Sequence, residues 1–215
     1  MSETDAFLCP LCQLKTGQPY FEDHRQYFYC PECALVFVPP TQFISAEEEK
    51  VIYELHENSA EDTGYRHFLM RMARPLLERL KPASQGLDFG SGPGPVLATL
   101  FNEAGHSVEN YDLFFAHKPQ LLAQQYDFIT ATEVVEHLHH PRQTLERLWT
   151  CLKPQGILGI MTKRVIDQDA FSRWHYKNDI THVCFFSEDS FQWLAQHWQA
   201  TLVIPEKDVV LLIKQ

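Results

Sequence analysis

Four cysteines near the amino terminus form two matched pairs. Cys9 and Cys12 make one C-x-x-C knuckle, and after seventeen residues Cys30 and Cys33 make a second. Each knuckle places two thiolates on one tight turn, and a hairpin between the knuckles would bring all four into a tetrahedral site that suits zinc. A redox dithiol needs only one knuckle, and two disulfides would need an oxidising compartment. We therefore expect a structural zinc ribbon over residues 1–40, with these four cysteines as ligands.

Glycines recur at two-residue spacing in GLDFGSGPG, residues 86–94. An apolar strand ends within this stretch, and the VLATLF that follows Pro95 has the periodicity of a helix. Glycine lets the backbone adopt positive φ, and a helix N-terminus offers N–H groups to a negatively charged ligand. No Lys-Ser or Lys-Thr pair follows, which argues against a P-loop nucleotide triphosphatase. Asp112 closes the next apolar stretch, where a ribose-binding carboxylate lies in nucleotide-binding βαβ units.

Acids and histidines gather in two later stretches. Glu133, Glu136 and His137 follow an apolar strand in EVVEHLHHP, at the carboxyl end, where ligands bind in open α/β sheets. His175 and His182 lie in FSRWHYKNDITHVCFFS, after a later strand, where substrate loops belong. Because histidine titrates near neutral pH, His175 and His182 are candidates for a catalytic general base. The alternative is that each is a structural histidine, hydrogen-bonded within its loop.

These residues must be positioned by strands and helices that alternate after residue 83. We expect strands at 107–112, 127–132, 156–162, 200–204 and 208–214, with helices at 142–152 and 188–198. This order predicts an α/β fold in which a mostly parallel sheet carries helices on both faces. The last two strands are joined too tightly for a crossover connection, so the final strand should be antiparallel. A turn is expected at LKPQG, before the strand at 156–162.

A helical bridge is expected between the ribbon and this sheet, over residues 41–82. Ser45 and Glu48 form a capping-box pattern that opens a first helix. A polar turn follows, and a second helical face then runs through residues 65–80. Pro75 should begin a new helical piece or kink this one.

Composition limits the classes of partner. The net charge is −10 and the pI is about 5.5, which argues against binding a nucleic acid or an anionic membrane. Within the expected ribbon, Lys15 and Arg25 stand against five acidic residues, which disfavours phosphate binding there. No apolar run approaches the length of a transmembrane helix, and the polar start MSETDAF is unlike a signal peptide. We expect a cytoplasmic protein with no membrane partner; the sequence leaves its oligomeric state open.

The D-x-G-x-G-x-G pattern, followed by Asp112, resembles motif I of class I S-adenosylmethionine-dependent methyltransferases. The resemblance implies a Rossmann-like methyltransferase domain over residues 83–215, with S-adenosylmethionine as cofactor. Families of this kind carry an adenine-binding acid in the segment that corresponds to residues 113–125, which is short here and lacks one. Leu113, Phe114 or Phe115 would then contact adenine; the alternative is that the two phenylalanines belong to the core. Arg66 and its neighbour Tyr65 would reach the methionine end of the cofactor. The implied cofactor-binding residues are Tyr65, Asp88, Gly90, Ser91, Gly92, Gly94, Asp112, Leu113, Phe114, Thr132 and Glu133.

EVVEHLHHP resembles the strand-four region of ubiquinone-biosynthesis O-methyltransferases and of small-RNA 2′-O-methyltransferases. In those families two glutamates and two histidines can hold a divalent metal beside the substrate hydroxyl. The resemblance implies a second metal site here at Glu133, Glu136, His137 and His182. On a helix, residues three and four apart face the same way, so Glu133 can converge with Glu136 and His137. The alternative is that the acids interact with a helix dipole and the histidine with backbone, since many methyltransferases with EHL at this place need no metal.

Almost the whole chain, ribbon included, resembles a widespread bacterial group of methyltransferases. The expected function is methyl transfer to a small-molecule acceptor, which the resemblance does not identify. The ribbon would then be a structural lid or a module that docks the substrate. Two alternatives stay open: an RNA-modifying enzyme, which the net acidity disfavours, and a non-enzymatic adapter whose ribbon recruits a partner protein.

Overall fold

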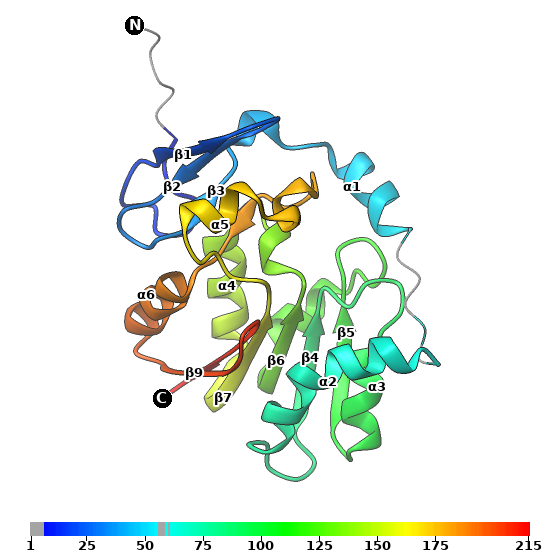
Figure 1. Cartoon of the computed structure of the whole chain (residues 1–215). Coiled ribbons are helices and arrows are strands. Elements are labelled where there is room, and N and C mark those ends of the chain that lie inside the picture. Colours follow the sequence, from blue (N-terminus) through cyan, green and yellow to red (C-terminus); the bar gives the residue numbers. More distant parts are fainter. Residues whose placement is uncertain (1–6, 56–58, 60) are drawn as a thin grey trace, which may run out of the picture.

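The computed structural model describes residues 7–55, 59 and 61–215, and Figure 1 shows their arrangement. Part of the polar turn expected near residue 60 lies outside the described residues. Among the described helices, none is long and apolar enough to span a membrane.

A six-stranded sheet forms the centre of the larger part of the molecule. Its strand order is β5-β4-β6-β7-β10-β9. Neighbouring strands from β5 to β7 pair in parallel, whereas β10 is antiparallel to both β7 and β9. The sheet therefore has the predicted α/β architecture with a reversed last strand. The strands are β4 Gln85–Phe89, β5 Ser107–Tyr111, β6 Tyr126–Thr132, β7 Leu152–Met161, β9 Thr201–Glu206 and β10 Val209–Ile213.

Helices cover both faces of this sheet because its central strands are apolar on both sides. Along β10, Val209 and Leu211 pack with α2 and α3, whereas Val210 and Leu212 pack with α4 and α6. The helices are α2 Thr63–Leu77, α3 Val96–Glu103, α4 Pro141–Thr150 and α6 Glu188–Trp198. Short 3₁₀ turns, η2 Pro119–Ala123, η3 Val135–His137 and η4 His175–Asn178, occupy the loops between elements.

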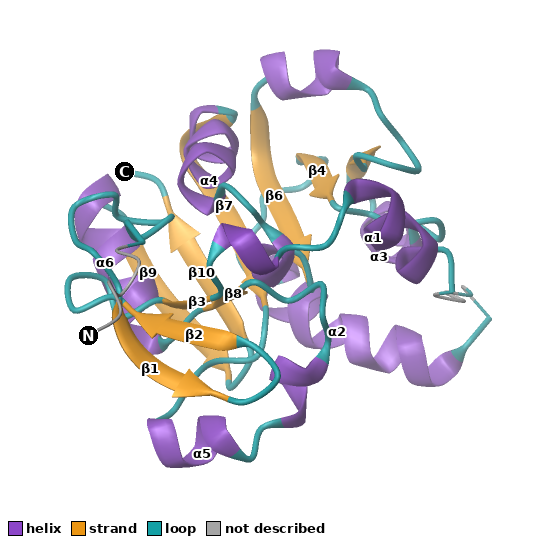
Figure 2. Cartoon of the chain, turned by 90° about the horizontal axis from the view of Figure 1, so that it is seen from above, coloured by secondary structure: helices purple, strands orange, loops and turns teal. Residues whose placement is uncertain are grey.

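A second, four-stranded sheet contains the ribbon and one strand from the distant carboxyl-terminal half. Its order is β1-β2-β3-β8, and every pair is antiparallel. The strands are β1 Gln18–Glu22, β2 Gln26–Tyr29, β3 Val36–Phe37 and β8 Cys184–Phe185. The view from above in Figure 2 shows this sheet lying over the larger one. The buried apolar side chains of the ribbon and of the α4–α6 face form one continuous cluster.

Two short elements connect the sheets along the chain. The 3₁₀ turn η1 Pro40–Gln42 leads into α1 Ala46–Tyr53. Ser45 and Glu48 form the expected capping box, because each side chain accepts a hydrogen bond from the other residue's backbone N–H. After β7 the chain forms the short helix α5 Gln168–Ser172, which lies against the ribbon.

Two local expectations differ from the structure. Helix α2 runs through Pro75 to Leu77 as one element, because a proline in the last turn removes only one of the hydrogen bonds near the helix end. LKPQG is the beginning of β7, where an irregular register places Leu152 opposite Tyr126 but Ile157 opposite Phe128. The left-handed backbone of Gln155, with φ of 65°, allows the extra residues to bulge out of the strand.

Candidate active site

A cavity of about 1160 Å³ opens at the carboxyl ends of β4, β5 and β6. Ligands bind at this edge in open α/β sheets. Residues from the glycine turn, the end of β5, helix α1 and the loop after α5 line it. Figure 1 shows α1 and the ribbon on the side of the molecule toward which the parallel strands point. The cavity thus lies between the edge of the sheet, helix α1 and the loop after α5.

The glycine turn is bound tightly to the end of β5. The N–H groups of Gly90 and Ser91 both donate to the carbonyl of Tyr111, at 2.8 and 3.2 Å. Gly90 has φ of 75°, and an added Cβ there would lie 2.4 Å from a methyl of Val134, so only glycine fits. Two hydroxyl oxygens beside the turn, Ser91 Oγ and Thr132 Oγ1, are buried and have no hydrogen-bond partner among the described residues. They are available to a bound polar ligand.

Asp112 is held at the edge of the cavity by three backbone N–H groups. Its Oδ2 accepts from Gly92 at 2.9 Å, and its Oδ1 accepts from Phe114 and Phe115 at 2.8 and 3.0 Å. The residue is only 8% exposed, yet it lines the cavity. Oδ1 already accepts two of these bonds, whereas Oδ2 accepts one and keeps capacity for a further hydrogen bond from a ligand hydroxyl.

Asp88 lies deeper, at the end of β4, and lines a small side cavity with Tyr65 and Gly94. Thr130 Oγ1 donates to Asp88 Oδ1 at 2.7 Å. Burial raises the pKa of Asp88 to about 6, and the nearby Asp112 charge adds to this effect. A cationic group bound beside Asp88 would oppose that rise. Burial also raises the pKa of Tyr65 to about 12, so its hydroxyl stays protonated.

The opposite side of the cavity contains a buried pair of glutamates around one tyrosine. The Tyr176 hydroxyl lies 3.2 Å from Glu133 Oε2 and also contacts Glu136 Oε1. Because a hydroxyl has one proton, bonding to both carboxyl groups requires a proton on one of them. Burial and the neighbouring Glu133 charge raise the pKa of Glu136 to about 8, and burial also raises the pKa of Glu133, so the pair holds that proton near neutral pH.

His182 is the buried histidine of the pair that we proposed as catalytic candidates. It is 6% exposed, and its Nδ1 donates to the carbonyl of Tyr176 at 2.7 Å. Burial lowers its pKa, which favours the neutral imidazole with Nε2 as an acceptor. His175 is exposed at the rim of the same cavity, with Nε2 3.4 Å from the Lys163 amine. The structure therefore brings both histidines to the cavity in different environments.

The expected second metal site is only partly assembled. Ligand atoms of Glu136, His137 and His182 lie within 4.8 Å of one another, but Glu133 is outside this group. Glu133 precedes the short 3₁₀ turn η3 and has φ of 50°, so the helical spacing that we assumed for these acids does not apply. Glu133 instead meets Glu136 through the shared Tyr176 hydroxyl.

The four ribbon cysteines form the second cluster of metal-ligand type. The Sγ atoms of Cys9 and Cys33 are 3.5 Å apart, as are those of Cys12 and Cys30, and all four lie within 4.8 Å of one another. Tetrahedral zinc with Zn–S bonds of about 2.3 Å requires S–S separations of about 3.8 Å. All six cysteines, each of them in the described part of the chain, are free of disulfides. The donor set and its spacing fit zinc.

The residues that line the cavity differ in part from those expected from the sequence. Arg66 is directed away, because it forms an ion pair with Glu103 on α3 at 2.6 Å. Glu49 and Tyr53 of α1 line the cavity and were missed. Their spacing of four residues on the first predicted helix was the available signal. The remaining expected cofactor residues at the cavity wall are Tyr65, Gly90, Ser91, Gly92, Leu113, Phe114, Thr132 and Glu133.

Comparisons with known proteins agree with this geometry. Residues 59–203, more than half of the chain, match the family described as a methyltransferase domain. A search of curated proteins gave no match. Among solved structures, a SAM-dependent methyltransferase from Archaeoglobus fulgidus is 17% identical with a TM-score of 0.54, over 71% of this chain and 74% of that one. The PH0226 protein from Pyrococcus horikoshii is 15% identical with a TM-score of 0.50, over 76% and 97%.

A third structure is similar over a larger part of the chain. The 1,6-didemethyltoxoflavin-N1-methyltransferase of Burkholderia thailandensis, solved with its substrate and S-adenosylhomocysteine, is 17% identical over 92% of this chain and 99% of that one, with a TM-score of 0.49. At such identities the likeness concerns the fold, and the family match decides the assignment. The chain belongs to the methyltransferase-domain family, which confirms its recognition as a class I S-adenosylmethionine-dependent methyltransferase.

Proposed function

We propose that this chain binds S-adenosylmethionine and transfers its methyl group to a small-molecule acceptor. The observation that carries the proposal is Asp112, whose carboxylate is fixed at the cavity edge by three N–H groups. The cofactor would supply a methyl group on a sulfonium, and the protein then mainly positions it and excludes water. Asp112 would accept hydrogen bonds from the ribose hydroxyls.

The unpaired polar atoms beside the glycine turn support binding of the amino-acid end of the cofactor. Asp88 would bind the ammonium group, because a cation relieves the cost of its buried charge. Ser91 Oγ and Thr132 Oγ1 have unused hydrogen-bonding capacity in the same region. Leu113 and Phe114 line the cavity beside Asp112 and would pack against adenine.

The size and lining of the cavity support a small acceptor beside the cofactor. Ligand pockets in proteins commonly enclose about 300–1,000 Å³, and 1160 Å³ leaves room for two molecules. His182, neutral and buried, would accept a proton from an acceptor hydroxyl or amine at Nε2. His175, at the rim, would serve a larger acceptor that extends toward solvent.

The proposal includes two metal ions, a structural zinc in the ribbon and a divalent cation in the active-site cavity. Zinc would be bound by the four ribbon cysteines and would stabilise the fold of the ribbon. As an alternative to proton transfer to His182, a divalent cation held by Glu136, His137 and Nε2 of His182 would orient an acceptor hydroxyl and lower its pKa. The use of all four cysteines as zinc thiolates would suit a reducing compartment such as the cytoplasm.

An RNA acceptor is the second candidate function, and the structure weakens its main support. The described ribbon residues contain two basic side chains of the Lys or Arg type, Lys15 and Arg25. Arg25 is 6% exposed and bonds to backbone carbonyls, so it is not available to phosphates. Filter binding of bulk RNA at low salt should show no retention; clear retention would favour the RNA enzyme over the small-molecule enzyme.

Titration calorimetry with S-adenosylhomocysteine tests the cofactor proposal. Asp112→Ala should weaken binding by about 100-fold, because a hydrogen bond to a charged acceptor is lost together with the bonds that fix the turn beside it. Glu109→Gln provides a matched control, because Glu109 is an exposed acid on the same strand β5. Folded wild-type protein that gives no heat at high cofactor concentration, or equal binding by both variants, would contradict the proposal.

A further inference from the structure

Arg25 makes an unusual set of contacts across the two sheets. It follows the turn between β1 and β2, and its guanidinium is directed into the loop after α5. Nη1 and Nη2 donate to the backbone carbonyls of Lys177, Ile180, Asp179 and His182, with distances of 3.0 Å to the last three. One buried side chain of the ribbon thus binds a loop more than 150 residues away in sequence.

This loop has no regular ladder of its own, and four of its carbonyls accept hydrogen bonds from Arg25. The 3₁₀ turn η4 ends at Asn178, and β8 begins only at Cys184. Unpaired buried carbonyls are costly, and a guanidinium can satisfy several of them from one plane. The cost of burying the Arg25 charge is offset only while the carbonyls remain in place, so side chain and loop stabilise each other.

Both ends of the loop are also joined to the ribbon. At one end, the Tyr27 hydroxyl donates to the carbonyl of Lys177 at 3.2 Å. At the other end, Val38 N–H donates to the carbonyl of Val183 at 2.9 Å, and Val183 N–H donates to the carbonyl of Glu136 at 2.8 Å. Between these ends lies the part of the loop that bonds to Arg25.

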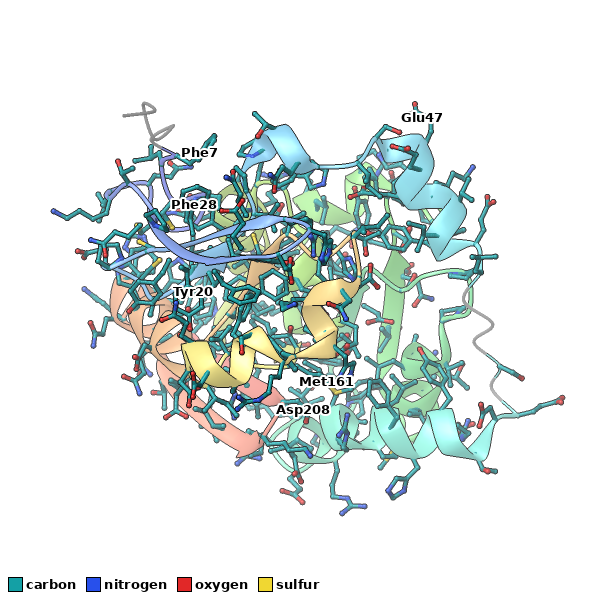
Figure 3. The ribbon with its side chains drawn as sticks, turned by 45° about the horizontal axis from the view of Figure 1, so that its top comes forward. Phe7, Tyr20, Phe28, Glu47, Met161 and Asp208 are labelled. Carbon is teal, nitrogen blue, oxygen red and sulfur yellow. The ribbon has the colours of Figure 1, made fainter. Side chains whose placement is uncertain are left out.

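The packing between ribbon and loop is aromatic and dense. Phe171 of α5 forms ring contacts with Tyr20, Phe21 and Tyr27 of the ribbon. Figure 3 shows Tyr20, labelled, at the side of the ribbon that meets the yellow segment containing α5. Lys177 also forms an ion pair with Asp23 of the ribbon. These contacts join the side chains of the ribbon and the loop, whereas the Arg25 bonds are made to the backbone of the loop.

We propose that Arg25 is a positioning residue through which the ribbon sets the acceptor side of the active site. Three residues of the Arg25-bound loop, Tyr176, Asp179 and His182, line the cavity. Among the described residues, the hydrogen bonds of the glycine turn do not involve the ribbon. The role of this side as the acceptor site rests on the proposed function. Loss of Arg25 therefore releases the acceptor side and leaves the cofactor side intact.

Hydrogen exchange measured by mass spectrometry on the full zinc-loaded chain tests this role. In Arg25→Ala, amides of residues 176–183 should exchange at least tenfold faster, because several bonds to a charged donor are lost. Amides of β2, β4 and β6 should keep their protection, and S-adenosylhomocysteine affinity should change by less than twofold. Arg164→Gln is the matched control, because Arg164 also donates to two backbone carbonyls, those of Lys207 and Glu206.

Chemical rescue separates positioning from general destabilisation. Millimolar methylguanidinium should restore protection of residues 176–183 in Arg25→Ala, and the same concentration of urea should not. Two results would overturn the proposal. One is wild-type protection of residues 176–183 in Arg25→Ala. The other is a loss of protection that extends equally over β2 and β3 and that methylguanidinium does not restore. The hydrogen-exchange readouts need no cofactor, so they decide the role of Arg25 even if wild-type protein fails to bind S-adenosylhomocysteine.

Discussion

The two sides of the active-site cavity are built by interactions of very different sequence range. On the cofactor side, Gly90 bonds to Tyr111 and Gly92 bonds to Asp112, contacts that span about twenty residues. On the acceptor side, the loop after α5 is bound by Arg25 from the beginning of the chain. The cofactor side is a local βαβ unit, whereas the acceptor side exists only after both ends of the chain have come together.

Removal of zinc should produce the largest difference between the two sides. Replacing Cys9 and Cys12 together by serine should abolish zinc binding, since structural zinc sites contribute about 10–16 kcal/mol to folding in zinc-finger peptides. Elemental analysis should find one zinc in wild-type protein and none in the variant. Hydrogen exchange should then rise in β1–β3 and residues 176–183 while β4 and β5 stay protected. Cys151→Ser, at a buried thiol outside the cluster, should keep its zinc.

If β4 and β5 lose protection as much as the ribbon does, the two sides are one cooperative unit. The continuous apolar cluster beneath the ribbon is the reason to make this measurement. Retained S-adenosylhomocysteine binding by the zinc-free variant would strengthen the distinction.

Two phenylalanines allow the same comparison within the apolar core. Phe171, 1% exposed, packs against the ribbon, and Phe101, fully buried, packs against Phe128 near the end of α3, the helix that follows the glycine turn. Either change to alanine should cost about 3–5 kcal/mol of unfolding free energy. Only Phe101→Ala should also weaken S-adenosylhomocysteine binding. Denaturant titration and calorimetry measure both effects, and a loss of cofactor affinity in Phe171→Ala would show that the two sides are coupled.

Asp88 should make the free protein less stable as pH rises. Its pKa is raised from 3.8 to about 6, so between these values the folded state holds a proton that the unfolded state has lost. Stability should therefore fall by roughly 3 kcal/mol across this interval. Asp88→Asn should remove that part of the slope and bind S-adenosylhomocysteine more weakly. Thermal unfolding from pH 4 to 7 gives the difference, and parallel curves for both proteins would rule out a buried, titrating Asp88.

Ser91→Ala should have the smallest effect and the most selective one. Its Oγ has no partner among the described residues, so free-protein stability should change by less than about 0.5 kcal/mol. Cofactor affinity should fall about fivefold through loss of one hydrogen bond. Calorimetry compares the variant with wild type; unchanged affinity would place the cofactor elsewhere in the cavity.

The placement of the glycine turn and Asp112 at one side of the cavity could be anticipated from the sequence because its signals are local. The glycine spacing, the strand before it and Asp112 lie close together, and the alternation of elements predicted the sheet and its reversed last strand. Glu133 was placed wrongly because a helix was assumed where a left-handed residue and a 3₁₀ turn occur. A φ of 50° at a glutamate has no sequence signature.

The acceptor side could not be anticipated in the same way. Cys184 and Phe185 form a strand of only two residues, too short for any periodic pattern. Arg25 was considered only as part of a charge balance, whereas its partners are backbone carbonyls, which every residue carries. Contacts of this kind depend on how the ribbon packs against the core. Such packing joins residues that are distant in sequence, so no local sequence pattern predicts it.

The pairing of β3 with β8 has a consequence for how the protein is made. A ribosome releases Val36 and Phe37 long before Cys184 and Phe185, their partners in the sheet. During that interval β3 is an open strand edge, the type of surface on which nascent chains aggregate. Zinc binding to the ribbon before β8 is synthesised would fold the ribbon early and reduce aggregation through β3. Cells starved of zinc should therefore accumulate this protein in insoluble form.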